Sequence, residues 1–148
     1  MSGDKKISST KISEALRARV AQRSKYRCCY CFAREELMGI RLHVDHIIPK
    51  KAGGETDEEN LCLACQSCNR SKWEDTHALD PISKQIVPLF NPNTQNWFEH
   101  FRWSEDGAII IGLTTCGRAT VSALQLNNHY MVRARKFWVK ANEHPPRE

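Results

Sequence analysis

The sequence lacks any long apolar run, and this absence excludes a protein that spans a membrane. Mean hydropathy is −0.56, and no segment approaches the roughly 20 consecutive apolar residues that a transmembrane helix needs. The start of the chain is polar and does not resemble a secretion signal. No internal repeat or low-complexity segment is present either. We therefore expect a cytoplasmic protein without membrane contact, with one domain or a small domain plus an extension in its 148 residues.

Without a secretion signal, the cysteines are better explained by metal binding than by disulfides. The chain has seven cysteines, an odd number, and four of them form two Cys-x-x-Cys pairs, at positions 28 and 31 and at positions 65 and 68. Four thiolates close a tetrahedral zinc site and leave no open position, so such a site is structural. The alternative is a set of buried free cysteines. We predict zinc bound by Cys28, Cys31, Cys65 and Cys68, and small core residues at Cys29, Cys62 and Cys116.

The positive charge is concentrated at the N-terminus. The formal net charge is +5, and the first 27 residues carry eight lysines and arginines against two acidic residues. Apolar residues recur every fourth position there, which predicts a helix over 11–24 capped by Thr10. Arg17, Arg19 and Arg23 fall largely outside the apolar stripe. They are candidates for contacts to nucleic-acid phosphates, and the alternative is a solvated helix face.

One run in the chain combines residue types that suit phosphodiester chemistry. Asp45 and His46 are adjacent, Asn60 follows His46 by fourteen residues, and Asn69 follows Asn60 by nine. With Ile47, Pro49, Leu61, Arg70, Lys72 and the two cysteine pairs, this run resembles the HNH nuclease family, in its zinc-stapled branch, over residues 28–73. The resemblance implies an α+β fold whose core is a two-stranded ribbon and a helix around one metal ion (the ββα-metal fold). It also implies cleavage of nucleic acid.

The resemblance also implies roles for individual residues. Asp45 and Asn69 would hold a catalytic divalent cation, and His46 would be the general base that activates water, leaving 5′-phosphate and 3′-hydroxyl ends. The neutral amide at Asn69 favours Mg²⁺ or Mn²⁺ over zinc. Asn60 would lock the loop that aims His46, and Arg70 and Lys72 would contact backbone phosphates. His43 is either an added ligand or phosphate contact, or an ordinary strand histidine.

Three regions follow from these patterns: a basic arm and helix over 1–27, a nuclease core over 28–76, and an extension over 77–148 that packs on or beside the core. In the core we predict two short strands across Gly39, a helical turn opened by a capping box of Thr56 and Glu59, and a helix over about 65–75. In the extension we predict a hairpin over 98–113, a helix capped by Thr115 and ending near Leu126, and a last helix marked by Met131, Ala134 and Trp138.

Three functions remain open at this point. The first is a DNA endonuclease that nicks or cuts both strands, and the second is a zinc-stabilised nucleic-acid-binding module without catalysis. The third is an HNH nuclease that acts on RNA, because a phosphodiester site does not read the sugar directly. The extension is a candidate surface for a homodimer or a partner protein, or for added DNA contact around Arg133, Arg135 and Lys136.

Overall fold

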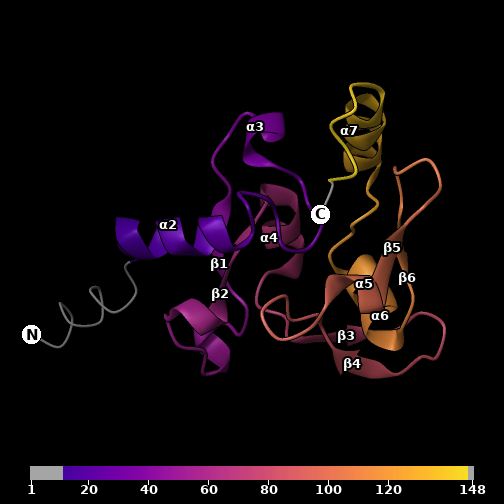
Figure 1. Ribbon diagram of the computed structural model, residues 1–148. Coiled ribbons are helices and arrows are strands. Elements are labelled where there is room, and N and C mark those ends of the chain that lie inside the picture. The colour runs from indigo at the N-terminus through magenta and orange to yellow at the C-terminus, as the bar shows by residue number, and fades with distance from the viewer. Residues whose placement is uncertain (1–11, 147–148) are drawn as a thin grey trace, which may run out of the picture.

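The computed structural model describes residues 12–146 and contains short helices and three separate two-stranded antiparallel sheets. Figure 1 shows helix α2 at one end, the extension at the other, and a central ribbon and helix between them. In chain order the elements are α2 (Glu14–Arg23), α3 (Glu35–Met38), β1 (His43–His46), η1 (Lys50–Ala52), η2 (Glu58–Asn60), β2 (Leu61–Ala64), α4 (Gln66–Lys72), β3 (His77–Leu79), β4 (Ile86–Pro88), α5 (Trp97–His100), β5 (Phe101–Trp103), β6 (Ile110–Gly112), α6 (Thr115–Ala123) and α7 (His129–Lys140). No helix of the described residues is long and apolar enough to cross a bilayer.

The central unit is the predicted ribbon and helix. Strand β1 pairs antiparallel with β2, with Asp45 opposite Cys62 and His46 opposite Leu61. All four residues of β2 are buried, as expected for a strand covered on both faces. Helix α4 follows β2 directly and is capped by Cys65, whose sulfur accepts from the Cys68 backbone N–H. The α+β class and the ββα core are therefore confirmed.

The strand positions differ from the prediction at one point. Residues before Gly39 form helix α3 rather than a strand, and Gly39 ends that helix in the left-handed conformation at φ 71°. The Glu35 carboxylate accepts from the Leu42 backbone N–H at 2.9 Å and fixes the turn into β1. The partner of β1 is instead β2, in which Leu63 lies opposite Val44. The Ile47 backbone N–H also donates to the Asn60 carbonyl at the end of this ribbon.

Helix α2 begins later than predicted. Its N-cap is Ser13, whose hydroxyl accepts from the Leu16 backbone N–H at 3.1 Å, whereas Thr10 lies outside the described residues. Val20 and Ala21 are its buried residues, and the helix lies against β2 and η2. Of the apolar residues in the predicted stripe, Val20 is buried and Ile12 and Leu16 are half-buried, whereas Ala15 is exposed.

The extension contains more structure than the sequence pattern indicated. Its hairpin is β5 and β6, with Trp103 opposite Ile110, but the residues before Phe101 are helical. A second hairpin, β3 and β4, was not predicted. Thr114 rather than Thr115 caps α6, and Asn128 caps α7. The Thr114 hydroxyl accepts from the Gly117 backbone N–H, and the Asn128 side chain accepts from the Met131 backbone N–H; both are N-cap bonds to the N–H three residues later.

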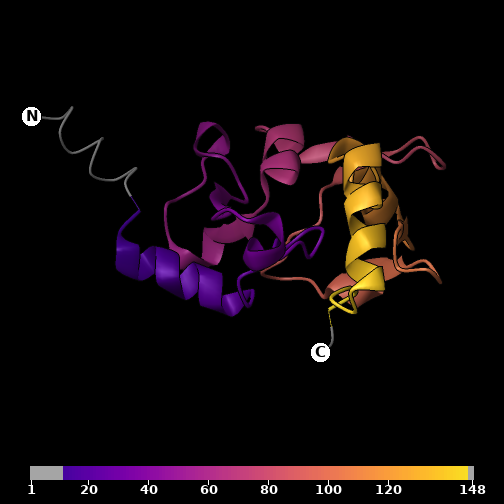
Figure 2. The same cartoon turned by 90° about the horizontal axis from the view of Figure 1, so that it is seen from above.

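The extension packs on the core through specific contacts. The Trp97 indole N–H donates to the Tyr30 carbonyl at 2.9 Å, and its ring stacks on Phe32 with centroids 4.4 Å apart. Seen from above in Figure 2, α2 and α7 lie at opposite ends of the molecule with the ribbon and α4 between them. One hydrophobic cluster runs through all three regions, so the extension and the core share an interior.

Candidate active site and four-cysteine centre

The four paired cysteines meet at one point. All four are buried, and their sulfurs lie within 4.8 Å of one another, with Cys31 Sγ 3.6 Å from Cys65 Sγ. Zinc–sulfur bonds of about 2.3 Å in a tetrahedron place sulfurs roughly 3.8 Å apart. Backbone N–H groups of Tyr30 and Cys68 point at Cys28 and Cys65 sulfurs, each at 3.4 Å. The centre thus has the composition and spacing of a structural zinc site.

The protonation of this cluster fits metal binding. Hydrogen bonds from neighbouring thiols, Cys28 first, hold the pKa of the Cys65 thiol far below its usual range. Shared hydrogen bonding with Cys28 raises the pKa values of Cys31 and Cys68, and burial adds to both shifts. Four buried sulfurs cannot all ionise without a cation among them. A divalent cation removes that conflict, because thiolates are the form that binds the metal.

The other cysteines lie outside this cluster. Cys62 is buried on β2, and its sulfur contacts the Tyr30 hydroxyl at 3.8 Å, while Cys29 and Cys116 are half-buried. The x-x spacing therefore selected Cys28 over its neighbour Cys29 correctly.

Asp45 is buried at the ribbon, with 8% of its surface exposed. Its Oδ2 lies 3.3 Å from the Lys72 ammonium, but no donor is aligned to form a hydrogen bond with that oxygen. Burial raises the pKa of Asp45, and Lys72 opposes the shift. A buried carboxylate oxygen that lacks a hydrogen bond is a suitable ligand atom for a cation.

Lys72 is not where the sequence pattern placed it. The side chain is 1% exposed, and its ammonium also donates to the His46 carbonyl at 3.1 Å. The ammonium is held by Asp45 and by the backbone of β1, and this buried position opposes the phosphate contact predicted at Lys72. Its position instead joins α4 to both motif residues of β1.

Asn69 precedes Lys72 by one helical turn on α4. Residues three apart are neighbours on a helix surface, and the Lys72 ammonium reaches Asp45 on β1. The Asn69 carbonyl also accepts from the Trp73 backbone N–H at 3.1 Å and closes the helix. This placement is compatible with the predicted metal role.

His46 is half-buried at the end of β1. Burial lowers its pKa, Lys50 and Lys72 add to this effect, and Asp45 opposes it. The ring is therefore neutral near pH 7 and able to accept a proton. Its Nε2 lies 2.8 Å from the Thr56 hydroxyl, a partner that the sequence did not reveal because Thr56 read as a helix cap.

Asn60 clamps the loop between these residues. Its side-chain carbonyl accepts from the Ile48 N–H at 2.9 Å, and its amide donates to the Ile48 and Glu55 carbonyls, each at 2.9 Å. The turn η2 that presents Asn60 is capped by Asp57 rather than Thr56, which corrects the predicted capping box. The backbone bonds expected of Asn60 are present on both sides of the loop.

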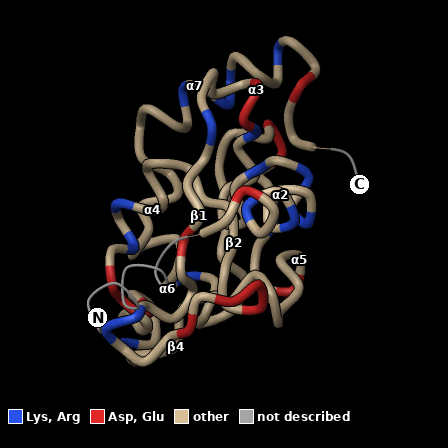
Figure 3. Tube along the Cα trace, turned by 90° about the vertical axis from the view of Figure 1, so that its left-hand side faces the viewer, with Lys and Arg blue, Asp and Glu red and all other residues tan. Residues whose placement is uncertain are grey.

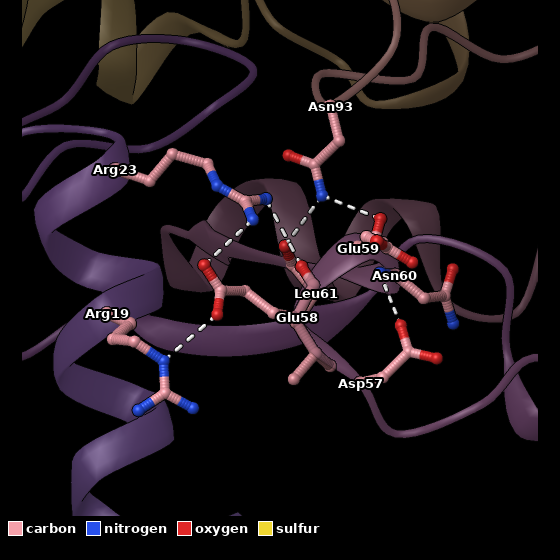
Figure 4. A network of polar contacts seen from close by, with 8 residues as sticks. All are labelled: Arg19, Arg23, Asp57, Glu58, Glu59, Asn60, Leu61 and Asn93. Atoms are coloured by element: carbon pink, nitrogen blue, oxygen red, sulfur yellow. Dashed lines mark hydrogen bonds and ion pairs between the residues drawn. The ribbon is translucent and has the colours of Figure 1, made fainter.

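The arginines of α2 are already engaged within the protein. Figure 4 shows Arg19 and Arg23 paired with the two carboxylate oxygens of Glu58, at 2.9 and 3.1 Å. Arg17 donates to the Leu42 carbonyl. Arg19 and Arg23 remain partly exposed, but their charge is offset by Glu58, whose pKa they lower. A phosphate contact from this helix remains a prediction, and it would compete with Glu58.

The remaining basic residues are spread over several elements. In Figure 3, lysines and arginines occur along α2, α4 and α7. Arg70 is exposed on α4 and lines an open groove of about 550 Å³ that Tyr130 borders from α7. Arg135, by contrast, is fully buried and donates to the Ala108 carbonyl at 2.9 Å, so it cannot belong to a DNA-binding face.

Asn93 is a further residue at the site that lies outside the motif. Its amide donates to the Glu59 carbonyl at 2.9 Å and to the Leu61 carbonyl at 3.0 Å, so it holds both neighbours of Asn60 (Figure 4). No sequence signal marked this asparagine of the extension.

Comparison with known proteins agrees with this geometry. No curated protein and no solved structure gives a match to the chain. A model of the HNH endonuclease family matches residues 28–74, the segment that contains both cysteine pairs, the ribbon and α4. Residues 28–74 of this chain are an HNH endonuclease domain.

Proposed function

We propose that the protein is a metal-dependent endonuclease that hydrolyses phosphodiester bonds in DNA, with His46 as general base. Asp45 carries the proposal: it is a buried carboxylate with an oxygen that lacks an aligned hydrogen bond, and it directly precedes a histidine whose pKa is lowered. A surface Asp-His pair would show neither feature. The family match supports a nuclease in general.

Asp45 and Asn69 would hold a divalent cation through oxygen atoms, which is the ligand chemistry of Mg²⁺ and Mn²⁺. Such a cation supplies charge neutralisation at the phosphoryl oxygens and at the leaving oxygen. Lys72 would favour the ionised form of Asp45 and hold it against α4, because its ammonium opposes the rise in pKa that burial causes.

His46 would take a proton from a water molecule as the water oxygen attacks phosphorus. The new P–O bond would form as the bond to the 3′ oxygen breaks, and the departing oxygen would take a proton from solvent water to become a hydroxyl. Positioned proton transfer of this kind contributes typically 10²–10⁴-fold to a rate. Asn60 contributes by holding the loop on either side of the histidine, with no contact to the substrate.

A zinc ion in the four-cysteine centre would hold the ribbon and α4 together and take no part in the reaction. Cys65 and Cys68 lie at the start of α4, and Cys28 and Cys31 lie in the turn before α3, so one ion would join that turn to the helix that carries Asn69. The extension is a proposed surface for a second copy or a partner protein.

The test is plasmid nicking with Mg²⁺ or Mn²⁺ added or omitted, because a strong chelator would also threaten the four-cysteine centre. Wild-type protein should nick only with added cation. Asp45→Ala and Asn69→Ala should bind Mn²⁺ more weakly in a spin-resonance titration and lose nicking, with zinc content unchanged. DNA binding without cleavage in wild type would favour a binding module, and cleavage confined to RNA would favour the RNA-directed alternative.

A further inference from the structure

We infer that Thr56 is a positioning residue for His46: its hydroxyl accepts the Nε2–H of the imidazole and leaves Nδ1 free to take the proton from water. This inference rests on the proposed function, because it assigns the base nitrogen of that reaction. The observation that supports it is the distance of 2.8 Å between His46 Nε2 and Thr56 Oγ1.

Thr56 is free to make this contact because another residue caps the turn that follows. The Asp57 carboxylate accepts from the Asn60 backbone N–H at 3.2 Å, so the Thr56 hydroxyl has no helix to cap. Thr56 is half-buried beside His46 although ten residues separate them in the chain.

The loop between the two residues is built to bring them together. Asn60 bonds Ile48, two residues after His46, and Glu55, one residue before Thr56. Gly54 is needed for this closure, since a Cβ there would lie 1.7 Å from the Ile48 carbonyl oxygen and 2.8 Å from the Asn60 amide nitrogen. Asn60 therefore fixes the distance between Thr56 and His46 as well as the path of the loop.

The contact decides which ring nitrogen is available. A neutral imidazole has one N–H and one lone pair. If Nε2 held the lone pair, it would face the Thr56 hydroxyl and Nδ1 would carry the proton, which leaves no base for water. With the proton on Nε2, donated to Thr56 Oγ1, the lone pair on Nδ1 is free. A hydrogen bond to one ring nitrogen also fixes the ring orientation, as it does for other functional histidines.

Two substitutions separate the hydroxyl from the shape of the side chain. Thr56→Val keeps the β-branched volume and removes the hydroxyl, whereas Thr56→Ser keeps the hydroxyl and removes a methyl group. We expect Thr56→Val to lower kcat by about 10- to 100-fold, with KM for DNA within about twofold of wild type. Thr56→Ser should stay within about threefold. Equal losses in both variants, or no loss in Thr56→Val, would overturn the assignment.

A measurement that needs no activity completes the test. The ¹⁵N shifts of the His46 ring in wild-type protein should show a protonated Nε2 and an unprotonated Nδ1, and Thr56→Val should mix the two tautomers while zinc content and unfolding midpoint stay unchanged. A wild-type ring protonated on Nδ1 refutes the inference whether or not either variant folds. A wild type that shows the expected tautomer but never cleaves nucleic acid refutes the proposed function and leaves the Thr56 contact standing.

Discussion

In the HNH domain the interior is centred on four cysteine sulfurs, whereas in the extension it is filled by aromatic rings and one buried arginine. Residues 28–74 contain two short strands, two α-helices of at most seven residues and two 3₁₀ turns. This is too little apolar surface for a fold of this size to hold itself together. The extension contributes Phe90, Trp97, Phe101 and Trp103, whose rings pack within about 6 Å of their neighbours. The same chain therefore uses a metal centre in one region and ordinary core packing in the other.

The two regions still share one interior, through Trp97 on Tyr30 and Phe32 and through Asn93 on the turn that presents Asn60. The difference between a metal-centred interior and a packed aromatic core should appear when a substitution destabilises only one of the two regions. Removal of metal should affect the HNH domain first, and loss of a buried polar anchor should affect the extension first.

The largest effect should follow loss of the zinc ligands. Zinc binding by such centres contributes about 10–16 kcal/mol to folding of a small metal domain, so Cys65→Ser should unfold the ribbon and α4. Cys29→Ser is the matched control, since it alters a neighbouring thiol outside the cluster and should keep one zinc per chain. Elemental analysis and amide NMR spectra check both variants. A well-folded HNH domain without zinc would contradict this view of the region.

A smaller effect should follow from Arg135→Met in the extension. Arg135 is fully buried and donates to the carbonyls of Ala108 and Leu126, so its loss leaves buried acceptors unpaired and should cost about 3 kcal/mol of unfolding free energy. Arg133→Met changes an exposed residue of the same helix and should cost less than about 1 kcal/mol. Urea denaturation measures both. Equal costs would show that the buried guanidinium does not anchor the extension.

The sequence alone predicts more of the structure in the HNH domain than in the extension. The cysteine spacing, Asp45-His46 and the position of α4 could be predicted because metal and phosphodiester chemistry restrict residue types at fixed spacings. The buried position of Lys72 could not, since a lysine after Asn69 and Arg70 reads as a phosphate ligand until the fold places it under β1. Asn93 and the contact of Thr56 with His46 depend on tertiary approach, which no local pattern encodes.

In the extension, the apolar pattern indicated a hairpin and two helices but not β3 and β4. Those strands have three residues each, as do β5 and β6, but the residues between β3 and β4 lack the Asp-Gly turn signal that lies between β5 and β6. Arg135 read as part of a basic helix face, and only the packing of α7 against Ala108 and Leu126 shows that it is internal.

Acid should also lower the unfolding free energy of the extension, by an amount between the largest and the smallest effects. Burial beside Arg135 lowers the pKa of His144 from 6.5 to about 4, and its ring bonds the Gly107 carbonyl at 3.1 Å. The unfolded chain binds the proton first, so the stability from neutral His144 is fully present above pH 6.5 and is lost as the pH falls toward 4. The loss amounts to at most about 3 kcal/mol.

Urea denaturation of wild type and His144→Gln at pH 7 and pH 4.5 isolates this contribution, because other titrating groups are common to both proteins. The stability difference between them should shrink at the lower pH. A difference that stays constant would mean that His144 is not protonated on unfolding.

The smallest effect should come from the contact of α2 with the HNH domain. Arg19 and Arg23 form exposed ion pairs with Glu58, and such pairs contribute less than about 1 kcal/mol each. Because the single carboxylate of Glu58 offsets one of the two charges, changing both to Gln should lower the salt dependence of DNA binding by about 0.9 or less in log–log slope. Arg70→Gln, at an exposed residue of α4, should lower it by about 0.9.

Anisotropy of labelled DNA at several salt concentrations, in the His46→Ala background, compares these variants. A fall of about two in the double variant would mean that DNA displaces Glu58 and that α2 contacts the phosphates directly, as its charge pattern first indicated.

The most direct test of the central claim is the nicking rate of His46→Ala against wild type, measured with the same added cation and with zinc content and unfolding midpoint verified as equal. The rate of His46→Ala should be lower by about 10²–10⁴-fold, because Asp45, Lys72 and the four-cysteine centre remain in place while the proton acceptor is gone. A variant that nicks within about threefold of wild type would show that His46 is not the general base.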